Sequence, residues 1–456
     1  MPFHHKYKKS LTGITAGLLL IIGGTWGQIQ GTAKTEISEP GLNELFNQVL
    51  YHVKNEYVEE TSAQKLWFGA IKGMLESLGD AHTRFMTPAE YNELQVETRG
   101  NFGGLGIEIS MRDGALTVVS PIPGTPAMRA GVQPGDRVIE INKQTTKNMS
   151  LTKAVKLLRG TPGTSVNLTV VREGEEELLY FDIVREVIKI KVAQSKFIED
   201  KKLGYIKLKQ FSQSSPRDLK KMLLDFKAKK AKGVIVDLRW NPGGLLDAAH
   251  KISNLFIKEG VIVSTRGRKK QLDRTFPAIP RNAIAPNLPI VVLANEGSAS
   301  ASEIVTGAIK DHKRGKFVGT KTFGKGSVQN VIPLMYKTAI ALTIQKYYTP
   351  NGISIHKKGI KPDVEVKSLE FSKNDRRRIR IITEKKLLTD IGKKYKRYNS
   401  ESVKAYKRLL KKQNLELSDF AARFTLKRHL NRNKATPLFD LEFDVQLKKA
   451  ISLLSK

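Results

Sequence analysis

The chain has 456 residues, 40% of them hydrophobic and 27% charged, which is the composition of a globular protein with room for roughly two to four domains. It contains no cysteine, which excludes disulfides, thiolate metal sites and a cysteine nucleophile. The net charge of +34 points to an anionic partner or surface, or simply to a lysine-rich surface that serves solubility, and we take the second reading as the default.

The N-terminal segment combines a basic flank with an apolar run. Lys6, Lys8 and Lys9 precede LTGITAGLLLIIGGTWG, and Gly31 and Ala33 offer the small residues of a cleavage site. This pattern predicts a signal peptide or signal anchor over residues 1–35, with the remainder exported. A buried N-terminal helix is the alternative, against which the lysine flank and the glycine pairs argue. Export makes DNA a poor explanation for the positive charge.

Helical patterning dominates residues 36–98. In LNELFNQVLYHVKNEYVEE apolar residues recur at every third or fourth position, and AQKLWFGAIKGMLESLG repeats the pattern before a glycine. From 99 to 187, short runs of branched apolar residues alternate with Gly, Pro and Asp, which predicts a compact β-rich module.

Strands and helices then alternate from 188 to 370, a pattern typical of a layered α/β domain. Residues 371–456 are helical by pattern and basic, with 24 Lys and Arg against 9 Asp and Glu. We expect this extension to bury its apolar residues against the core or a second subunit. The alternative is electrostatic docking on an anionic membrane or cell-wall surface.

A turn between an expected strand and an expected helix, ANEGSASASEIV, carries Ser298, Ser300 and Ser302. A serine at a helix start either caps the helix or lies where free backbone N–H groups can hold an oxyanion. One cap explains one serine, and a catalytic serine also needs a base. His312 and Asp311 lie a full helix length from Ser300, so an ordinary helix end explains them better.

The stretch GTKTFGKGSVQ places Lys325 between two glycines. It nearly matches a nucleotide-binding P-loop, but Gly326 occupies the position of the required hydroxyl. A lysine here is either an ordinary turn residue or, where burial lowers its pKa, a general base. Gln329 would lie on the same face of a strand and orient the lysine amine through its amide oxygen.

A second strand-turn-helix unit, VIVDLRWNPGGLLDAA, places Gly243 and Gly244 at a strand end. The two glycines make either a simple tight turn or one that presents a backbone N–H to a ligand, because sites on α/β sheets gather at such strand ends.

The run NEGSASASEIVTGAIKDHKRGKFVGTKTFGKGSVQ resembles the carboxyl-terminal processing proteases, which are serine endopeptidases with a Ser-Lys catalytic pair. The likeness extends over roughly residues 40–368 and includes GMLESLGDAHTRFMTPAEY, DLRWNPGG and YYTPNGISIHKKGIKPDVEV. Ala81 departs from the family pattern, which has proline there. The resemblance implies a multidomain α+β fold, with a crotonase-like α/β protease core at 188–370, a PDZ domain inserted at 99–187, and helical segments at 36–98 and 371–456.

The resemblance also implies a set of catalytic residues: Ser300 as nucleophile, Lys325 as base, Gln329 as its support, and the N–H groups of Ala301 and of Gly243 or Gly244 as oxyanion donors. In GGLGIEI it implies a loop that binds a peptide's C-terminal carboxylate, at Gly104, Leu105, Gly106 and Ile107. The PDZ domain of the family recruits substrate tails and gates the site, and Arg159 matches an arginine that holds the active arrangement in some members.

The function implied is that of an exported serine endopeptidase of the periplasm or cell envelope, anchored in the membrane if the N-terminal segment stays uncleaved. Its substrates would be proteins with apolar C-terminal tails. Its reaction would need neither a metal nor another cofactor. The family's terminal helices suggest a homo-oligomer, and an activating adaptor and envelope association are left open.

The alternative is a PDZ-based binding or adaptor protein with an inactive protease-like core, against which the complete Ser, Lys and Gln set argues. A nucleic-acid binder would need base-stacking aromatics among its basic residues, and the basic segment offers only a few tyrosines.

Overall fold

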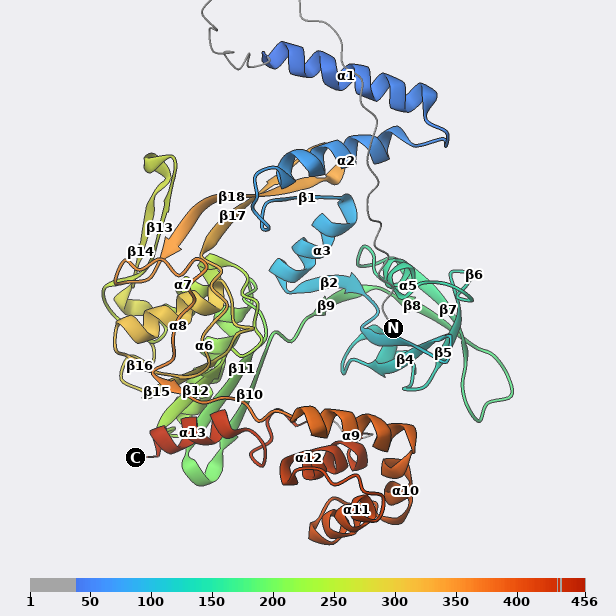
Figure 1. Ribbon diagram of the computed structural model, residues 1–456, viewed down its shortest axis with the longest axis vertical. Helices are drawn as coiled ribbons and strands as arrows, with labels where there is room; N and C mark the ends of the chain where they lie inside the picture. The colour runs from blue at the N-terminus through green and yellow to red at the C-terminus, as the bar shows by residue number, and fades with distance from the viewer. Residues whose placement is uncertain (1–37, 433, 435–436, 456) are drawn as a thin grey trace, which may run out of the picture. The chain divides into compact units, whose positions relative to one another are not determined.

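The computed structural model describes residues 38–432, 434 and 437–455 (Figure 1). The predicted signal or anchor segment, residues 1–35, lies outside the described residues. The chain divides into two units, Met1–Ala70 and Ile71–Lys456. None of the helices in the described ranges is long and apolar enough to cross a membrane.

The described part of the first unit is helical. The first helix, α1 (Glu39–Glu56), begins where the Ser38 hydroxyl accepts a hydrogen bond from the N–H of Gly41. The second, α2 (Ala63–Glu76), starts in this unit and continues past its end. The rings of Phe46 and Trp67 pack with centroids 5.4 Å apart, so the apolar periodicity of both segments corresponds to a helix contact.

A β-rich module follows the strand β1 (Arg84–Met86) and the helix α3 (Pro88–Arg99). Its antiparallel sheet has the order β3-β4-β5-β7-β8, with β6 paired to β5, while β2 and β9 pair separately where the chain enters and leaves. One apolar core fills it, which includes Val118, Ile141 and Leu168. The elements are β2 (Asn101–Gly104), β3 (Ile107–Arg112), β4 (Ala115–Pro121), α4 (Pro126–Arg129), β5 (Arg137–Ile141), β6 (Gln144–Thr145), α5 (Leu151–Leu158), β7 (Ser165–Val171), β8 (Leu179–Val184) and β9 (Glu186–Lys189).

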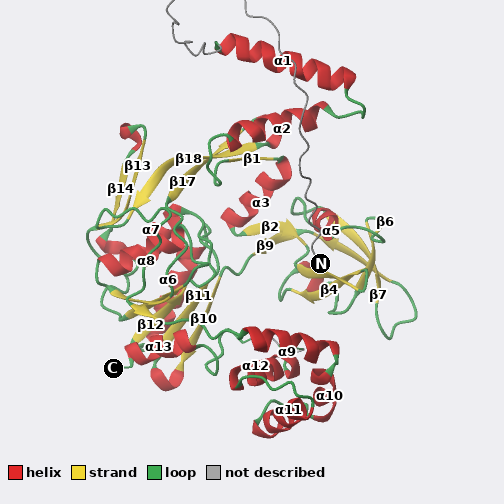
Figure 2. Cartoon of the chain, in the orientation of Figure 1, coloured by secondary structure: helices red, strands yellow, loops and turns green. Residues whose placement is uncertain are grey.

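The α/β domain is built on a second sheet of order β10-β11-β12-β15-β16-β19, which is parallel except for β10 (Figure 2). A third, antiparallel sheet has the order β1-β18-β13-β14, with β17 paired to β18. The elements are β10 (Ala193–Ile198), β11 (Leu203–Leu208), α6 (Ser215–Ala228), β12 (Gly233–Asp237), α7 (Leu246–Asn254), β13 (Val261–Gly267), β14 (Arg274–Pro277), β15 (Ile290–Ala294), α8 (Ala301–Asp311), β16 (Gly315–Gly319), β17 (Ser327–Pro333), β18 (Ala339–Tyr348) and β19 (Val364–Glu365).

Side chains alternate along the strands of the parallel sheet, so its apolar residues divide between two layers. Val234 and Val236 of β12 face a core shared with α6, α7 and α8, whereas Ile235 faces a core shared with the last helix, α13 (Val445–Leu454). Leu447 and Ala450 of α13 are fully buried there. Both faces of the sheet are therefore covered, as a parallel sheet requires, and one cover comes from the segment predicted as a C-terminal extension.

The rest of that extension forms a helical cluster with its own apolar core, which includes Ile382, Tyr406, Leu410 and Leu426. Its helices are α9 (Lys373–Glu384), α10 (Leu387–Lys394), α11 (Ser400–Lys412) and α12 (Asp419–Leu430). The basic side chains of this segment thus surround a packed interior.

Candidate active site

Ser300 lies in the turn that connects β15 to α8, and its backbone is strained. Its φ of 56° and ψ of −115° lie in a region that residues with a side chain rarely adopt. Such a conformation costs on the order of 1–3 kcal/mol and persists only where the surroundings enforce it, most often at functional sites. Ser298 and Ser302 are fully buried, and their hydroxyls donate to the carbonyl oxygens of Leu238 and Asn241. Of the three serines, Ser300 is the one that is partly exposed.

A buried carboxylate, that of Glu303, joins the serine turn to the lysine loop. It accepts hydrogen bonds from the N–H groups of Ser300 (2.9 Å), Gly324 (2.8 Å) and Lys325 (2.8 Å), and from the hydroxyl of Thr322 (2.6 Å). Burial raises the pKa of Glu303, although these hydrogen bonds oppose the shift. One side chain therefore holds the backbones of Ser300 and Lys325 to the same point.

Tyr347 of β18 makes a second link between the same two residues. Its single O–H lies within hydrogen-bond distance of two acceptors, the carbonyl oxygen of Ser300 at 3.0 Å and, through a short contact, that of Lys325. The side chain is only 2% exposed, and burial together with the charge of Glu303 raises the pKa of Tyr347 well above its usual value. Sequence reasoning singled out neither residue, although the spacing of Ser300 and Glu303 matches the S-x-x-E of a capping box, which would have marked the glutamate.

The Lys325 amine lies in an environment that disfavours its charge. Burial lowers the pKa of Lys325, the nearby charge of Arg84 lowers it further, and Asp80 opposes both. No hydrogen bond joins Ser300 Oγ to Lys325 Nζ within the described part of the chain. In unliganded enzymes such bonds are often long and tighten only with substrate.

Gln329 bonds to neighbours other than Lys325. Its amide nitrogen donates to the hydroxyls of Ser327 (2.9 Å) and Thr343 (3.2 Å). The expected shared strand face does not arise, because β17 begins only at Ser327 and its pairing with β18 is irregular between Val328 and Gln329.

The glycine turn lies directly against Ser300. A Cβ on Gly243, whose φ is 108°, would lie 2.8 Å from the Cβ of Ser300 and 3.0 Å from the nitrogen of Ala301. The Gly243 N–H donates to Oδ1 of Asn241 at 2.9 Å, and Gly244 pairs with the backbone of Phe211. Ala301 is the first residue of α8, so its N–H has no intrahelical acceptor.

The expected peptide-binding loop connects β2 and β3. Gly106 has a φ of 77°, and a Cβ there would lie 2.3 Å from Thr125, whose hydroxyl donates to the Gly106 carbonyl oxygen at 3.0 Å. Leu105 between the glycines is buried and accepts a hydrogen bond from the N–H of Ala127 at 3.0 Å. These contacts fix the backbone of a loop that comprises Gly104, Leu105, Gly106 and Ile107.

Arg159 follows α5. Its guanidinium pairs with Glu93 of α3 at 2.6 Å and lies over the ring of Phe102, 4.6 Å from the centroid. Neither Lys325 nor Gln329 is among its hydrogen-bond or ion-pair partners in the part of the chain that the structure describes.

Comparison with known proteins places these features in one family. Residues 202–366 match the model of peptidase family S41, residues 117–172 that of the PDZ domain, and residues 27–89 that of the activating protease CtpB N-terminal domain. A carboxy-terminal-processing protease of Bartonella bacilliformis is 43% identical over 325 residues, which cover 70% of this chain and 74% of the relative. The chain belongs to the carboxy-terminal processing protease family. It is thus a serine-type peptidase with a PDZ domain, as the sequence motifs predicted.

Further relatives extend the likeness along the chain. The carboxy-terminal processing protease CtpA of Bacillus subtilis is 31% identical over 458 aligned residues. The alignment covers 97% of this chain and 96% of CtpA. Among solved structures, a photosystem II D1 C-terminal processing protease is 29% identical with a TM-score of 0.42, and covers 71% of this chain and 86% of that one.

Proposed function

We propose that this processing protease is an exported endopeptidase in which Ser300 is the nucleophile and Lys325 the general base. The observation that carries the proposal is the Glu303 carboxylate, which accepts hydrogen bonds from the N–H groups of both residues. The strained backbone of Ser300 and the lowered pKa of Lys325 support the same assignment. A base needs a neutral amine, and burial favours that form.

In the proposed reaction Ser300 Oγ attacks the carbonyl carbon of the scissile peptide bond while Lys325 Nζ accepts its proton. The resulting oxyanion would be held by the N–H of Ala301 and by that of Gly243 or Gly244. The protonated Lys325 then gives its proton to the leaving amine. Water, deprotonated by Lys325, hydrolyses the acyl-enzyme and regenerates Ser300. Gln329 would turn to orient the lysine amine once substrate is bound.

Substrate tails would bind at Gly104, Leu105, Gly106 and Ile107 of the PDZ domain. Hydrogen bonds from Ala127 and Thr125 fix the backbone at Leu105 and Gly106, so the N–H groups of the loop can be pre-organised for a terminal carboxylate. Arg159 would leave Glu93 and Phe102 to stabilise the active arrangement. Export rests on the lysine flank and apolar run of residues 1–35, and a reporter that is active only outside the cytoplasm, fused after residue 35, tests it.

The experiment that tests the activity uses an unfolded protein with an apolar C-terminus. We expect cleavage by the wild type and none by Ser300→Ala or Lys325→Arg, because arginine does not release its proton. An amidated C-terminus should weaken binding of the substrate to the PDZ domain. Binding without cleavage by the wild type would instead favour the adaptor alternative.

A further inference from the structure

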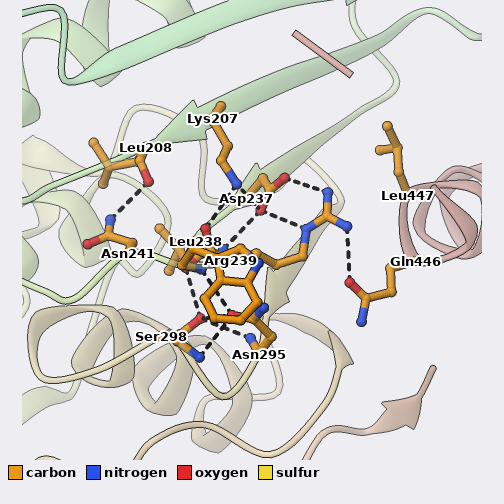
Figure 3. A network of polar contacts seen from close by, with 12 residues as sticks. Lys207, Leu208, Asp237, Leu238, Arg239, Asn241, Asn295, Ser298, Gln446 and Leu447 are labelled. Carbon is orange, nitrogen blue, oxygen red and sulfur yellow. Dashed lines mark hydrogen bonds and ion pairs between the residues drawn. The ribbon is translucent and has the colours of Figure 1, made fainter. Parts of the chain in front are cut away.

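Arg239, two residues beyond β12, is held between carboxylates from two distant parts of the chain. Its guanidinium donates to both oxygens of Asp444 at 2.7 Å and to the two oxygens of Asp237 at 3.0 and 2.6 Å. Gln446 accepts a further hydrogen bond at 3.0 Å (Figure 3). The Arg239 side chain is 13% exposed and that of Asp237 is 1% exposed. Two bidentate pairs therefore fix both the position and the plane of this guanidinium.

The charges of this network balance. Lys207 Nζ lies 3.1 Å from Asp237 Oδ1 and donates to the carbonyl oxygen of Arg239 at 3.0 Å, so two cations face two carboxylates. The bonds to both carboxylates raise the pKa of Arg239 despite the cost of its burial. Without Asp444, one buried carboxylate would face two cations, and Arg239 would lose a bidentate partner.

Arg239 leads directly into the glycine turn. The next N–H, that of Trp240, donates to Asn295 at 2.9 Å. Asn241 then accepts hydrogen bonds on its carbonyl oxygen from the N–H of Ala299 (3.1 Å) and the hydroxyl of Ser302 (2.9 Å). The chain that Arg239 anchors is thus bonded to residues on both sides of Ser300.

The second partner in the Arg239–Asp444 contact belongs to the C-terminal segment. Asp444 caps α13, because its Oδ1 accepts from the N–H of Leu447 at 2.9 Å. Asp440 and Glu442, which precede Asp444 in the chain, both pair with Lys427 of α12, at 2.8 Å and 2.9 Å. Residues 440–444 are therefore attached to the helical cluster as well as to the core.

We propose that Asp444 is a positioning residue for proteolysis, which sets the glycine turn against Ser300 through Arg239. The inference rests on the proposed function, in which this turn supplies an oxyanion donor. It assigns to the C-terminal segment a part in the peptidase site.

The test compares Asp444→Ala, Asp444→Asn and Asp444→Glu in the full chain. Each is assayed for kcat and KM and for affinity for a peptide boronate, which forms a tetrahedral adduct with a reactive serine. Asp444→Ala should lower kcat about ten- to a hundredfold, less than the roughly hundred- to thousandfold cost of deleting an oxyanion donor, because the donor would be displaced and not removed. KM should stay nearly unchanged, and boronate affinity should fall in parallel with kcat. Asp444→Asn should fall between Asp444→Ala and the wild type, and Asp444→Glu should restore much of the loss because it keeps the charge.

Two controls separate positioning from folding. Asp419→Asn removes a carboxylate that pairs only with Lys407 and Arg423 among the described residues, so it should keep wild-type kcat. Leu447→Ala weakens the packing of α13 but removes no hydrogen bond of Arg239, since the Leu447 side chain is apolar, and it should lose thermal stability but little kcat. Equal loss of kcat in Leu447→Ala and Asp444→Ala would overturn the proposal, as would wild-type kcat and boronate affinity in Asp444→Ala. A wild type that neither cleaves nor binds the boronate would contradict the proposed function instead.

Discussion

Glu303 is fully buried and has no role in the proposed proton transfers, yet it accepts four hydrogen bonds from the two loops that carry Ser300 and Lys325. A carboxylate suits this position because both of its oxygens are acceptors, and all four groups around it are donors. We infer that it keeps the proposed nucleophile and the proposed base in register.

Glu303→Gln tests this. The amide group would turn an N–H₂ donor toward other donors, so we expect a loss of about 1–3 kcal/mol in the free energy of unfolding. Because both loops would shift, kcat should also fall by about a hundredfold or more. Chemical denaturation and steady-state kinetics measure the two effects. Glu296→Gln is the matched control, since that exposed side chain bonds only to Thr320 among the described residues and should change neither. A Glu303→Gln enzyme with normal kcat would show that the shared carboxylate is dispensable.

The pH profile of the protease should report the charges around Lys325. With Lys325 as the base, the rate should rise with pH as the amine loses its proton. It should level off below the ordinary lysine pKa, because burial and Arg84 lower the pKa of Lys325. Asp80→Asn removes the charge that opposes this shift, so the profile should move to lower pH. Arg84→Gln removes a charge that favours it, so the profile should move to higher pH.

Opposite shifts in the two variants, measured as kcat against pH at low ionic strength, are the required outcome. Shifts in one common direction, or none, would contradict the assignment of Lys325 as the base.

The resemblance to the family predicted Ser300 and Lys325 in one site, and the structure brings their backbones together at Glu303. The contacts of Gln329 and Arg159 could not be predicted, because they depend on a strand irregularity and on the partner helix α3. The contact of Glu303 with Ser300 could have been predicted, since their spacing is that of a capping box. The contacts of Tyr347 could not, because no local pattern marks a tyrosine that contacts two distant carbonyl groups.

Among the elements, the glycine turn after β12 packs directly against Ser300, the proposed nucleophile. Gly243 combines a positive φ with a backbone that touches Ser300, so both strain and space exclude a side chain there. The turn and the start of α8 therefore behave as one packed unit.

Gly243→Ala should abolish most activity, by about a hundredfold or more, because the new methyl would push the turn away from Ser300. Gly131→Ala separates strain from contact, since Gly131 has a φ of 89° and no atom within 4 Å of an added Cβ. It should cost about 1 kcal/mol of stability and leave kcat unchanged. Equal activity in both variants would show that the contact with Ser300 has no catalytic consequence.

Periodicity predicted the main helices and strands of the α/β domain because each carries its own apolar pattern. It could not predict that β1, β13, β14, β17 and β18 form a separate antiparallel sheet. Pairing between strands far apart in sequence depends on register and on the faces they bury, which no local pattern contains.

On the scale of the whole molecule, the C-terminal segment has two roles. Helices α9 to α12 pack around their own core, whereas α13 covers one face of the parallel sheet. Truncation after residue 370 would remove both, so it would test folding of the core together with assembly.

A cleaner test of assembly deletes residues 373–430 and joins the flanks with a flexible linker, which keeps α13. If the helical cluster contributes a subunit contact, light scattering at high salt should give a lower molecular mass for the deleted protein. High salt screens electrostatic docking but spares apolar contacts. An unchanged mass together with lost binding to anionic vesicles would favour surface docking by the basic residues.

The place of α13 in chain order has a consequence for biosynthesis. Helices α6, α7 and α8 are interleaved with the strands they cover, so that face can be covered as the polypeptide emerges from the ribosome. The opposite face stays bare until α13, the last helix of the described chain, has been translated. Exposed sheet surface in nascent proteins favours misassociation, so a holdase chaperone would be expected to bind this face during translation. If Asp444 sets the glycine turn, the peptidase also gains its working geometry only after the rest of its core has formed.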